Sequence, residues 1–186
     1  MTQTVLETPR LILRPLRESD AGDVYEYARD PRVGPIAGWP PHQSVDESLE
    51  IIHIVFSTPG VFAMELKETG TVIGSVGFVG NHPAGEFTDC PDDEIGYALS
   101  PAFWGRGLMP EAVDAVLEYG FTELGLQRIW CGHYAGNWQA KRVMEKCGFR
   151  YQFSRTEFVK LVGETRQSYF YLLTKEGWRE RVSGAV

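Results

Sequence analysis

The chain has 186 residues, a length that suits one domain rather than two with separate cores. Hydrophobic residues make up 43% and charged residues 23%, so the composition excludes disordered, collagen-like and coiled-coil chains. Eighteen Lys and Arg residues against 25 Asp and Glu residues give a net charge of −7, which argues against binding to nucleic acid or an anionic membrane. An acidic chain suits cationic partners such as amines.

Three cysteines, Cys90, Cys131 and Cys147, are an odd number and include no C-x-x-C pair. Neither a disulfide framework nor a metal site is therefore expected. Residues 1–16 carry charges and no long apolar run, so no signal peptide or membrane anchor is predicted. We expect a cytoplasmic protein that is a monomer or a homodimer.

The chain begins with a predicted strand and a short helix. Residues 11–16 read as an edge strand, because Pro15 cannot donate a hydrogen bond to a neighbouring strand. Ser19 or Asp20 then caps a helix that extends to about Arg29.

A loop and a second helix follow. Residues 31–41 are rich in Gly and Pro, which predicts a loop. Ser44 with Glu47 three residues later is a capping box that opens a helix. Its apolar stripe, at helical spacing, is Val45, Leu49, Ile52 and Phe56.

The rest of the chain alternates between strands and helices. Three strands in an antiparallel meander are expected at 61–66, 71–80 and 94–100. A helix, a strand, a helix and a closing hairpin are then expected at 109–124, 128–134, 138–147, 150–161 and 166–174. This order is typical of a mixed α/β sheet, of the α+β type, rather than of repeated βαβ units.

A Gly-rich turn, Trp104-Gly-Arg-Gly-Leu-Met109, lies between a predicted strand and helix. Gly105 and Gly107 allow backbone N–H groups to converge at the helix N-terminus, where the helix dipole favours an anion such as a pyrophosphate. No Gly-Lys-Ser/Thr follows and a third glycine is missing, so the turn is neither a P-loop nor a dinucleotide-binding fingerprint. A plain tight turn is the alternative interpretation.

Several stretches resemble the GNAT superfamily of acyl-CoA-dependent N-acetyltransferases. The turn 104–109 resembles the Q/R-x-x-G-x-G/A acetyl-CoA signature, and residues 137–149 resemble the N-x-x-S/A-x-x-V-x-E-K-x-G-F helix. Residues 7–16 and 38–42 are similar to the RimJ/RimL branch, which acetylates protein N-terminal amines. The resemblance implies one GNAT-like domain over residues 1–186, with a mixed, mostly antiparallel sheet flanked by helices and a central strand splayed at the acyl-CoA site.

The resemblance also implies which residues would contact acetyl-CoA as the acyl donor. They are Leu99, Trp104, Gly105, Arg106, Gly107, Leu108, Met109, Asn137 and Lys141. We expect Lys141 rather than Arg142 because residues three, four and seven positions after Asn137 share its helical face. Two positions depart from the family pattern: Trp104 stands where Gln or Arg is usual, and Met109 where Gly or Ala is expected.

Acetyl transfer from a thioester to an amine needs a neutral amine, a polarised carbonyl and a departing thiolate. Glu94 is the expected general base, at a position similar to that of the catalytic glutamate in several GNAT enzymes. A solvated acidic loop over residues 89–94 is the alternative interpretation. Many family members carry a general-acid Tyr where this chain has Met144, and a Ser is frequent where it has Ala140. Tyr134 is therefore the candidate acid, against a purely structural role for a buried tyrosine.

One candidate base and one candidate acid favour an acceptor amine that loses its proton easily. An α-amine has a pKa of about 7.7 to 8.0 and a lysine about 10.4, so an α-amine needs little help from a base. We expect direct transfer in a ternary complex to a protein N-terminal α-amine, between a wall of Trp39, Pro40 and His42 and the acidic run 89–94. A small amine acceptor, such as a polyamine, antibiotic or amino acid, and a non-catalytic acyl-CoA-binding module remain open alternatives.

Overall fold

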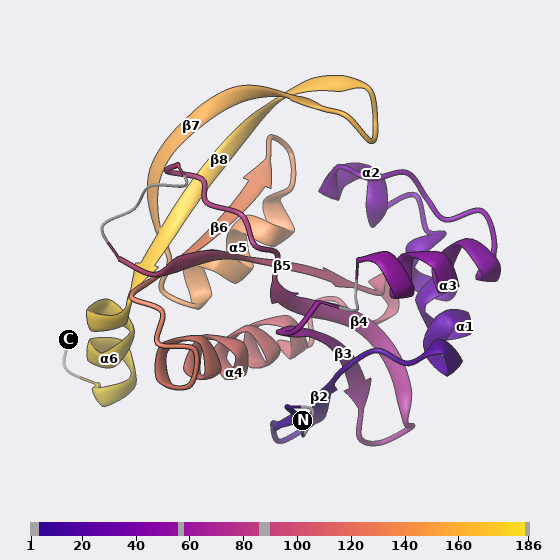
Figure 1. Ribbon diagram of the computed structural model, residues 1–186, viewed down its shortest axis with the longest axis horizontal. Helices are drawn as coiled ribbons and strands as arrows, with labels where there is room; N and C mark the ends of the chain where they lie inside the picture. Colours follow the sequence, from indigo (N-terminus) through magenta and orange to yellow (C-terminus); the bar gives the residue numbers. More distant parts are fainter. Residues whose placement is uncertain (1–3, 56–57, 86–89, 185–186) are drawn as a thin grey trace.

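Strands in the described part of the chain form one sheet, with the order β1-β2-β3-β4-β5-β6-β8-β7 (Figure 1). The computed structural model describes residues 4–55, 58–85 and 90–184. The strands are β1 (Leu6–Glu7), β2 (Leu11–Arg14), β3 (Val61–Leu66), β4 (Thr71–Phe78), β5 (Asp92–Leu99), β6 (Arg128–Tyr134), β7 (Arg150–Val159) and β8 (Glu164–Thr174). Neighbouring strands are antiparallel except for β5 and β6, which are parallel. The mixed, mostly antiparallel sheet expected from the sequence is confirmed.

Helices cover both faces of the sheet. They are α1 (Ala21–Ala28), α2 (Gly34–Ala37), α3 (Val45–Ile54), α4 (Leu108–Thr122), α5 (Trp138–Lys146) and α6 (Lys175–Ser183). One apolar cluster joins α1 and α3 and includes Ala98 of β5, whereas Leu99, the next residue, belongs to the larger cluster around α4. Adjacent residues of a strand point to opposite faces, so α1 and α3 lie on one side of β5 and α4 lies on the other. No described helix combines the length and apolar character needed to cross a lipid bilayer.

Helix α4 joins the two halves of the sheet. Val113, Val116 and Leu117 are fully buried, at the spacing that places one helical stripe against a sheet. Gly120 allows close packing, because a methyl group there would lie 2.6 Å from Phe78 of β4 and 3.0 Å from Ile129 of β6. A larger residue at this position would push α4 away from the sheet.

Strands β5 and β6 pair over only three residues each, Asp92–Glu94 with Arg128–Trp130. We call this short contact the β5–β6 seam. Beyond it, β5 continues along β4 as far as Leu99 while β6 continues along β8. The opening between them is bordered by α5, where the Tyr97 hydroxyl donates to the Ala140 carbonyl at 3.0 Å. The backbone therefore opens at the centre of the sheet, as the resemblance implied.

Three details of the N-terminal half differ from expectation. Strand β2 is not an edge strand, because β1 pairs with it and Pro15 lies just beyond Arg14, its last paired residue. The expected loop 31–41 contains the short helix α2, which ends at Gly38 in the left-handed conformation, with φ +94°. Val45, assigned to the buried stripe of α3, is 44% exposed. Phe56 of the same stripe lies outside the described residues.

Two details of the C-terminal half also differ from expectation. Leu124, expected to end the apolar pattern of α4, is 45% exposed and lies after the helix. Helix α6 was not expected. Its Trp178 ring packs 5.4 Å from the Phe121 ring, and the Thr174 hydroxyl caps it by accepting from the Gly177 N–H at 3.1 Å. A single aromatic contact gives no periodic pattern, which explains why this helix was missed.

Candidate active site

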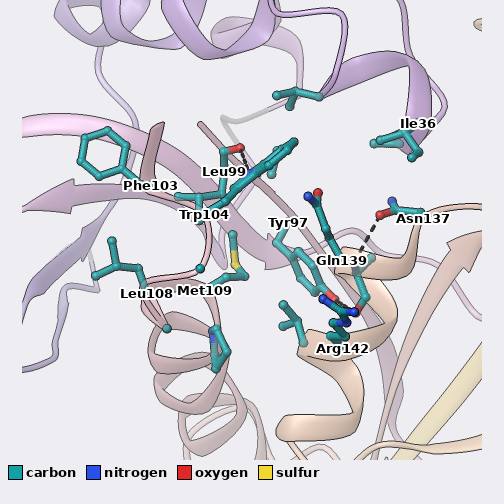
Figure 2. Close-up of a pocket in the computed structure, with 18 of the residues that line it drawn as sticks. Ile36, Tyr97, Leu99, Phe103, Trp104, Leu108, Met109, Asn137, Gln139 and Arg142 are labelled. Atoms are coloured by element: carbon teal, nitrogen blue, oxygen red, sulfur yellow. Dashed lines mark hydrogen bonds between the residues drawn. The ribbon is translucent and has the colours of Figure 1, made fainter. Parts of the chain in front are cut away.

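A cavity of about 350 Å³ lies between α5 and the loop that precedes α4; we call it the loop cavity (Figure 2). It is lined by all but two of the residues expected to contact a cofactor: Leu99, Trp104, Gly105, Gly107, Leu108, Met109 and Asn137. The two that do not line it are Arg106 and Lys141.

Two glycines shape the loop that opens α4. Gly105 and Gly107 have φ of +75° and +74°, in the left-handed region that side chains rarely adopt, and Gly107 is the N-cap of α4. The Trp104 indole N–H donates to the Leu99 carbonyl at 2.9 Å and fixes the loop to the end of β5 (Figure 2). The N-terminus of α4 therefore borders the loop cavity, an arrangement that favours an anion.

The N-terminal segment braces this loop. Glu111 in the first turn of α4 accepts from the Thr8 hydroxyl at 2.6 Å, from the Arg10 N–H at 2.9 Å and from the Arg10 Nε at 2.7 Å. Arg10 Nη1 also donates to the Arg106 carbonyl at 2.8 Å. Burial raises the pKa of the Glu111 carboxyl, but these hydrogen bonds more than offset the rise and leave that pKa below its usual value. The Arg106 guanidinium lies 5.1 Å from the Phe103 ring and does not line the loop cavity. The contact of Arg106 with Arg10 is made by its backbone carbonyl.

The expectation that Lys141 rather than Arg142 faces this cavity is wrong. Arg142 lines the loop cavity (Figure 2), whereas Lys141 Nζ lies 3.6 Å from Glu145 Oε1 and 5.8 Å from the Trp138 ring. The physical reason is that Asn137 is not part of the helical face of α5.

Asn137 is instead the N-cap of α5, with the non-helical angles φ −82° and ψ 68°, and its side chain accepts from the Ala140 N–H at 3.2 Å. The face toward the cavity begins at Gln139 and continues three, four and seven positions later. It consists of Gln139, Arg142, Val143 and Lys146, together with Ala140.

Positive charge dominates the loop cavity. Of the described residues that line it, three are cations, Arg32, Arg142 and Lys146, and none is a carboxylate. Arg32 comes from the segment before α2, and its guanidinium is 2.7 Å from Asp30 and 5.8 Å from the Trp104 ring. Cations beside a helix N-terminus suit the phosphates of a nucleotide.

A second cavity of about 760 Å³ lies over the sheet beneath α1 and α3; we call it the sheet cavity. Both residues expected for catalysis, Glu94 and Tyr134, line it, as do Trp39, Pro40 and His42, which were expected on one side of the acceptor. Residues that were not expected also line it, including Tyr27, Asn81, Arg155, Glu157, Ser168 and Phe170. The residues that line both cavities are Ala37, Tyr97, Ala98, Asn137 and Ala140. The two cavities therefore meet at the opening between β5 and β6.

Glu94 lies at the end of the β5–β6 seam. Asn81 donates a side-chain hydrogen bond to its carboxylate, and a methyl group at Gly132 would lie only 3.0 Å from its Oε1. Burial raises the pKa of Glu94 and the nearby Glu157 adds to the rise, whereas the Asn81 hydrogen bond and Arg155 act in the opposite direction. A carboxylate with a raised pKa is better matched to accepting a proton near neutral pH.

The acidic run before Glu94 does not form a wall of the sheet cavity as expected. Asp92 accepts from the Trp130 indole at 3.0 Å and lies 2.7 Å from His82 Nδ1, while Asp93 accepts from the Gly80 N–H at 2.9 Å. These carboxylates hold the ends of the strands together, and Asp89 lies outside the described residues. Within the described ranges, no three His, Cys, Asp or Glu side chains are grouped as metal ligands.

Tyr134 packs against the end of α2, and His42 contacts α3. Gly38 leaves room for the Tyr134 ring, because a methyl group there would lie 2.6 Å from Tyr134 Cε2. Burial raises the pKa of the Tyr134 hydroxyl, so it keeps its proton at neutral pH. His42 Nδ1 lies 2.8 Å from the Ser48 hydroxyl, and burial lowers the pKa of its ring.

Comparisons with known proteins agree with this geometry. A family model described as "Acetyltransferase (GNAT) domain" matches residues 10–150. The chain belongs to this family. A relative, N-acetyltransferase p20 of Bacillus licheniformis, is 30% identical over 177 residues, which cover 91% of this chain and 96% of the relative.

Solved structures of acetyltransferases share the fold. An acetyltransferase of the GNAT family from Bacillus anthracis superposes with a TM-score of 0.80 at 24% identity, covering 93% of this chain and 99% of that one. The ribosomal-protein-S5-alanine acetyltransferase from Vibrio fischeri superposes with a TM-score of 0.72 at 19% identity, covering 94% and 98%. These likenesses show the fold alone. The family assignment makes the protein an N-acetyltransferase, and GNAT domains use acetyl-CoA as the acyl donor.

Proposed function

We propose that the protein transfers the acetyl group of acetyl-CoA directly to a protein N-terminal α-amine, and that donor and acceptor meet where the two cavities join. The opposite charge of the cavities carries this proposal. The loop cavity is lined by cations, whereas the described lining of the sheet cavity contains Glu47, Glu94 and Glu157 and one guanidinium, that of Arg155. A polyanionic donor suits the first cavity and a cationic acceptor suits the second.

The loop cavity fits the phosphates of acetyl-CoA. A methyl group at Gly105 would touch nothing within 4 Å, so a glycine is needed there for the left-handed backbone, with φ +75°, rather than for space. Such a turn would allow successive N–H groups to converge on an anion. The N–H groups of residues 106–109 would hold the diphosphate, and Arg142 and Lys146 would add charge. When bound, acetyl-CoA supplies a thioester whose thiolate is the leaving group.

Glu94 acts on the acceptor in this proposal. Its carboxylate accepts the proton of the ammonium group and leaves a neutral amine that can attack. Tyr134, which keeps its proton, is the proposed acid. Met144, at the position where many family members carry a general-acid Tyr, is 1% exposed in the core and supplies no proton.

An α-amine is the acceptor that this machinery serves best. At neutral pH about a tenth of an α-amine is already neutral, against well under a thousandth of a lysine, so a single carboxylate is enough. The volume of the sheet cavity, about 760 Å³, lies in the upper part of the range for ligand pockets and leaves room for a peptide backbone behind the amine. The Vibrio fischeri enzyme shows that this fold hosts acetylation of a ribosomal protein.

Calorimetric titration with acetyl-CoA tests the donor, and labelled acetyl-CoA offered to N-terminal peptides and to a panel of small amines tests the acceptor. The proposal expects binding, thiol release and label in the peptides. Binding without thiol release would make the protein a non-catalytic acyl-CoA-binding module. Label confined to small amines would show that the acceptor is a small molecule.

A further inference from the structure

Arg155 is the one guanidinium among the described residues that line the sheet cavity. Its Cζ lies 4.6 Å from the centroid of the Phe170 ring. Its Nε donates to Glu157 Oε2 at 3.0 Å, and its Nη1 donates to the Pro83 carbonyl at 3.1 Å. The planar group is therefore held in position on three sides, which limits the conformational entropy that it would lose on binding an acceptor.

Arg155 also lies close to Glu94. A methyl group at Gly132 would be 3.0 Å from Glu94 Oε1 and 3.3 Å from the Phe170 ring, so the carboxylate and the ring meet at one point of the backbone. Arg155 stacks on that same ring. In addition, Asn81 bonds to Glu94 while the carbonyl of Pro83, two residues later, bonds to Arg155. An acceptor whose amine reaches Glu94 thus comes near the guanidinium.

Donors remain available on Arg155 for such an acceptor. A guanidinium has five N–H donors, and the bonds to Glu157 and Pro83 use two of them. The charge is largely balanced by Glu157, whose Oε1 also accepts from the Ser168 hydroxyl at 2.5 Å. Because this pair is near neutral, it is better suited to a neutral carbonyl oxygen than to a free carboxylate.

We propose that Arg155 donates a hydrogen bond to the carbonyl oxygen next to the reacting α-amine, and so selects acceptors that carry an amine and an amide carbonyl on the same carbon. Peptide N-termini and amino-acid amides have this arrangement, whereas lysine side chains and polyamines do not. Arg155 is then a specificity-determining residue. The inference rests on the proposed function and names the part of the acceptor that the protein recognises.

The test compares L-alaninamide with isopropylamine, which has a methyl group in place of the carboxamide. The ratio of kcat/KM between the Arg155→Met variant and the unaltered protein is measured for each amine, so that the different basicities of the amines cancel. We expect a loss of roughly ten- to a hundredfold with alaninamide, as for a hydrogen bond from a charged donor, and less than about twofold with isopropylamine. Most of the loss should appear in KM.

Two further variants guard against a structural effect. Arg150→Met, on the same strand and away from both cavities, should leave both ratios near one. Arg155→Lys keeps a donor and should recover part of the activity with alaninamide. Free alanine, which presents a carboxylate, should be a poorer acceptor than alaninamide for the unaltered protein.

Equal losses with the two amines would overturn the inference, because Arg155 would then only hold the wall of the cavity. No loss with alaninamide, a better rate with free alanine, or acetylation of peptides but of neither small amine would also overturn it. All of these outcomes leave the proposed function standing. Failure of every amine and peptide to release thiol is the separate result that rejects the proposed function, and this inference with it.

Discussion

Two glutamates of the active site show how surroundings decide the use of a carboxylate. Glu94 is half-buried, accepts a side-chain hydrogen bond from Asn81 and has a raised pKa, which suits a proton acceptor. Glu111 takes hydrogen bonds from Thr8 and Arg10 and has a lowered pKa, which keeps it charged as a brace for α4. The same side chain therefore serves chemistry at one place and structure at the other.

Replacing Glu94 by Gln should slow catalysis without weakening the binding of acetyl-CoA. Glutamine keeps the size of the side chain but cannot take the proton, so we expect kcat to fall by roughly ten- to a hundredfold. Thiol release measures kcat, and calorimetry measures the Kd of acetyl-CoA. Glu123→Gln, at an exposed carboxylate after α4, is the matched control. Full activity of the Glu94→Gln protein would show that Glu94 is not the general base and that water accepts the proton.

Glu94 should also leave a signature in the pH dependence of stability. Because its pKa is raised in the folded protein, its contribution to stability is complete below the unfolded pKa and is lost as pH rises through the folded pKa. The Glu94→Gln protein has no such charge to bury. Its melting temperature relative to the unaltered protein should therefore rise from pH 4 toward pH 8, as followed by circular dichroism. A constant difference across this range would contradict the burial of a charge at Glu94.

Neighbouring cations on α5 offer a sharp test of which face meets the cofactor. Arg142→Gln should raise the Kd of acetyl-CoA about tenfold, equivalent to about 1.4 kcal/mol, because a charged contact to phosphate is lost. Lys141→Gln removes the same charge one residue away, from a side chain outside the loop cavity, and should change the Kd by less than about twofold. Similar effects in the two variants would mean that only the general field of the protein matters.

The sequence predicted a site residue where the residue belongs to a local motif. It did not predict site residues that come from segments far apart along the chain. Gly105, Gly107 and Glu94 lie on one strand–turn–helix unit, whose spacing is visible in the sequence. Arg32 and Arg155 reach the cavities from elements far away along the chain, and no local pattern marks them. Arg32 reaches the site through the placement of α2, and Arg155 through the pairing of β8 with β6 and of β7 with β8.

At the scale of elements, a pair of glycine variants tests whether the turn before α4 binds acetyl-CoA, unlike an ordinary left-handed turn. Gly107→Ala and Gly125→Ala place the same methyl group on residues with φ of +74° and +70°, so each should destabilise the fold by roughly 1–2 kcal/mol. Only Gly107 begins α4 beside the loop cavity. Relieving its strain would displace the converging N–H groups, and the Kd of acetyl-CoA should rise on the order of tenfold. Kd is measured by calorimetry. Equal Kd values for the two variants would show that the turn before α4 does not bind the phosphates of acetyl-CoA.

Elements with strong patterns were found and weak ones were not. Helix α4 and the meander β3–β4–β5 have long periodic runs, and their existence is confirmed within one or two residues. Strand β1 has two residues and α2 has four, too short for a period to be visible. Tertiary contacts hold these elements: β1 through pairing with β2, and α2 through Tyr134 against Gly38.

For the whole molecule, the family resemblance and the order of elements together predicted the sheet and its opening. The sequence alone contained no signal for the length of the β5–β6 seam, because the register of a parallel pair depends on helices that cross over between the strands. Trp130 and Asp92 close the seam through a hydrogen bond of 3.0 Å across the two strands. Such pairs become evident only when the strands are placed side by side.

The β5–β6 seam also divides the chain in two. All strands before Gly125 lie on one side of the seam and all strands after it lie on the other, and Gly125 is in an exposed turn. A protein supplied as two fragments, 1–124 and 125–186, would keep every strand pair except the seam intact within one fragment. The loop cavity takes Trp104, Gly107 and Leu108 from the first fragment and Gln139, Arg142 and Lys146 from the second. Acetyl-CoA that contacts both fragments would therefore favour their association. The fragment concentration needed for reassembly should fall when acetyl-CoA is added, and reassembly indifferent to it would place the cofactor on one fragment alone.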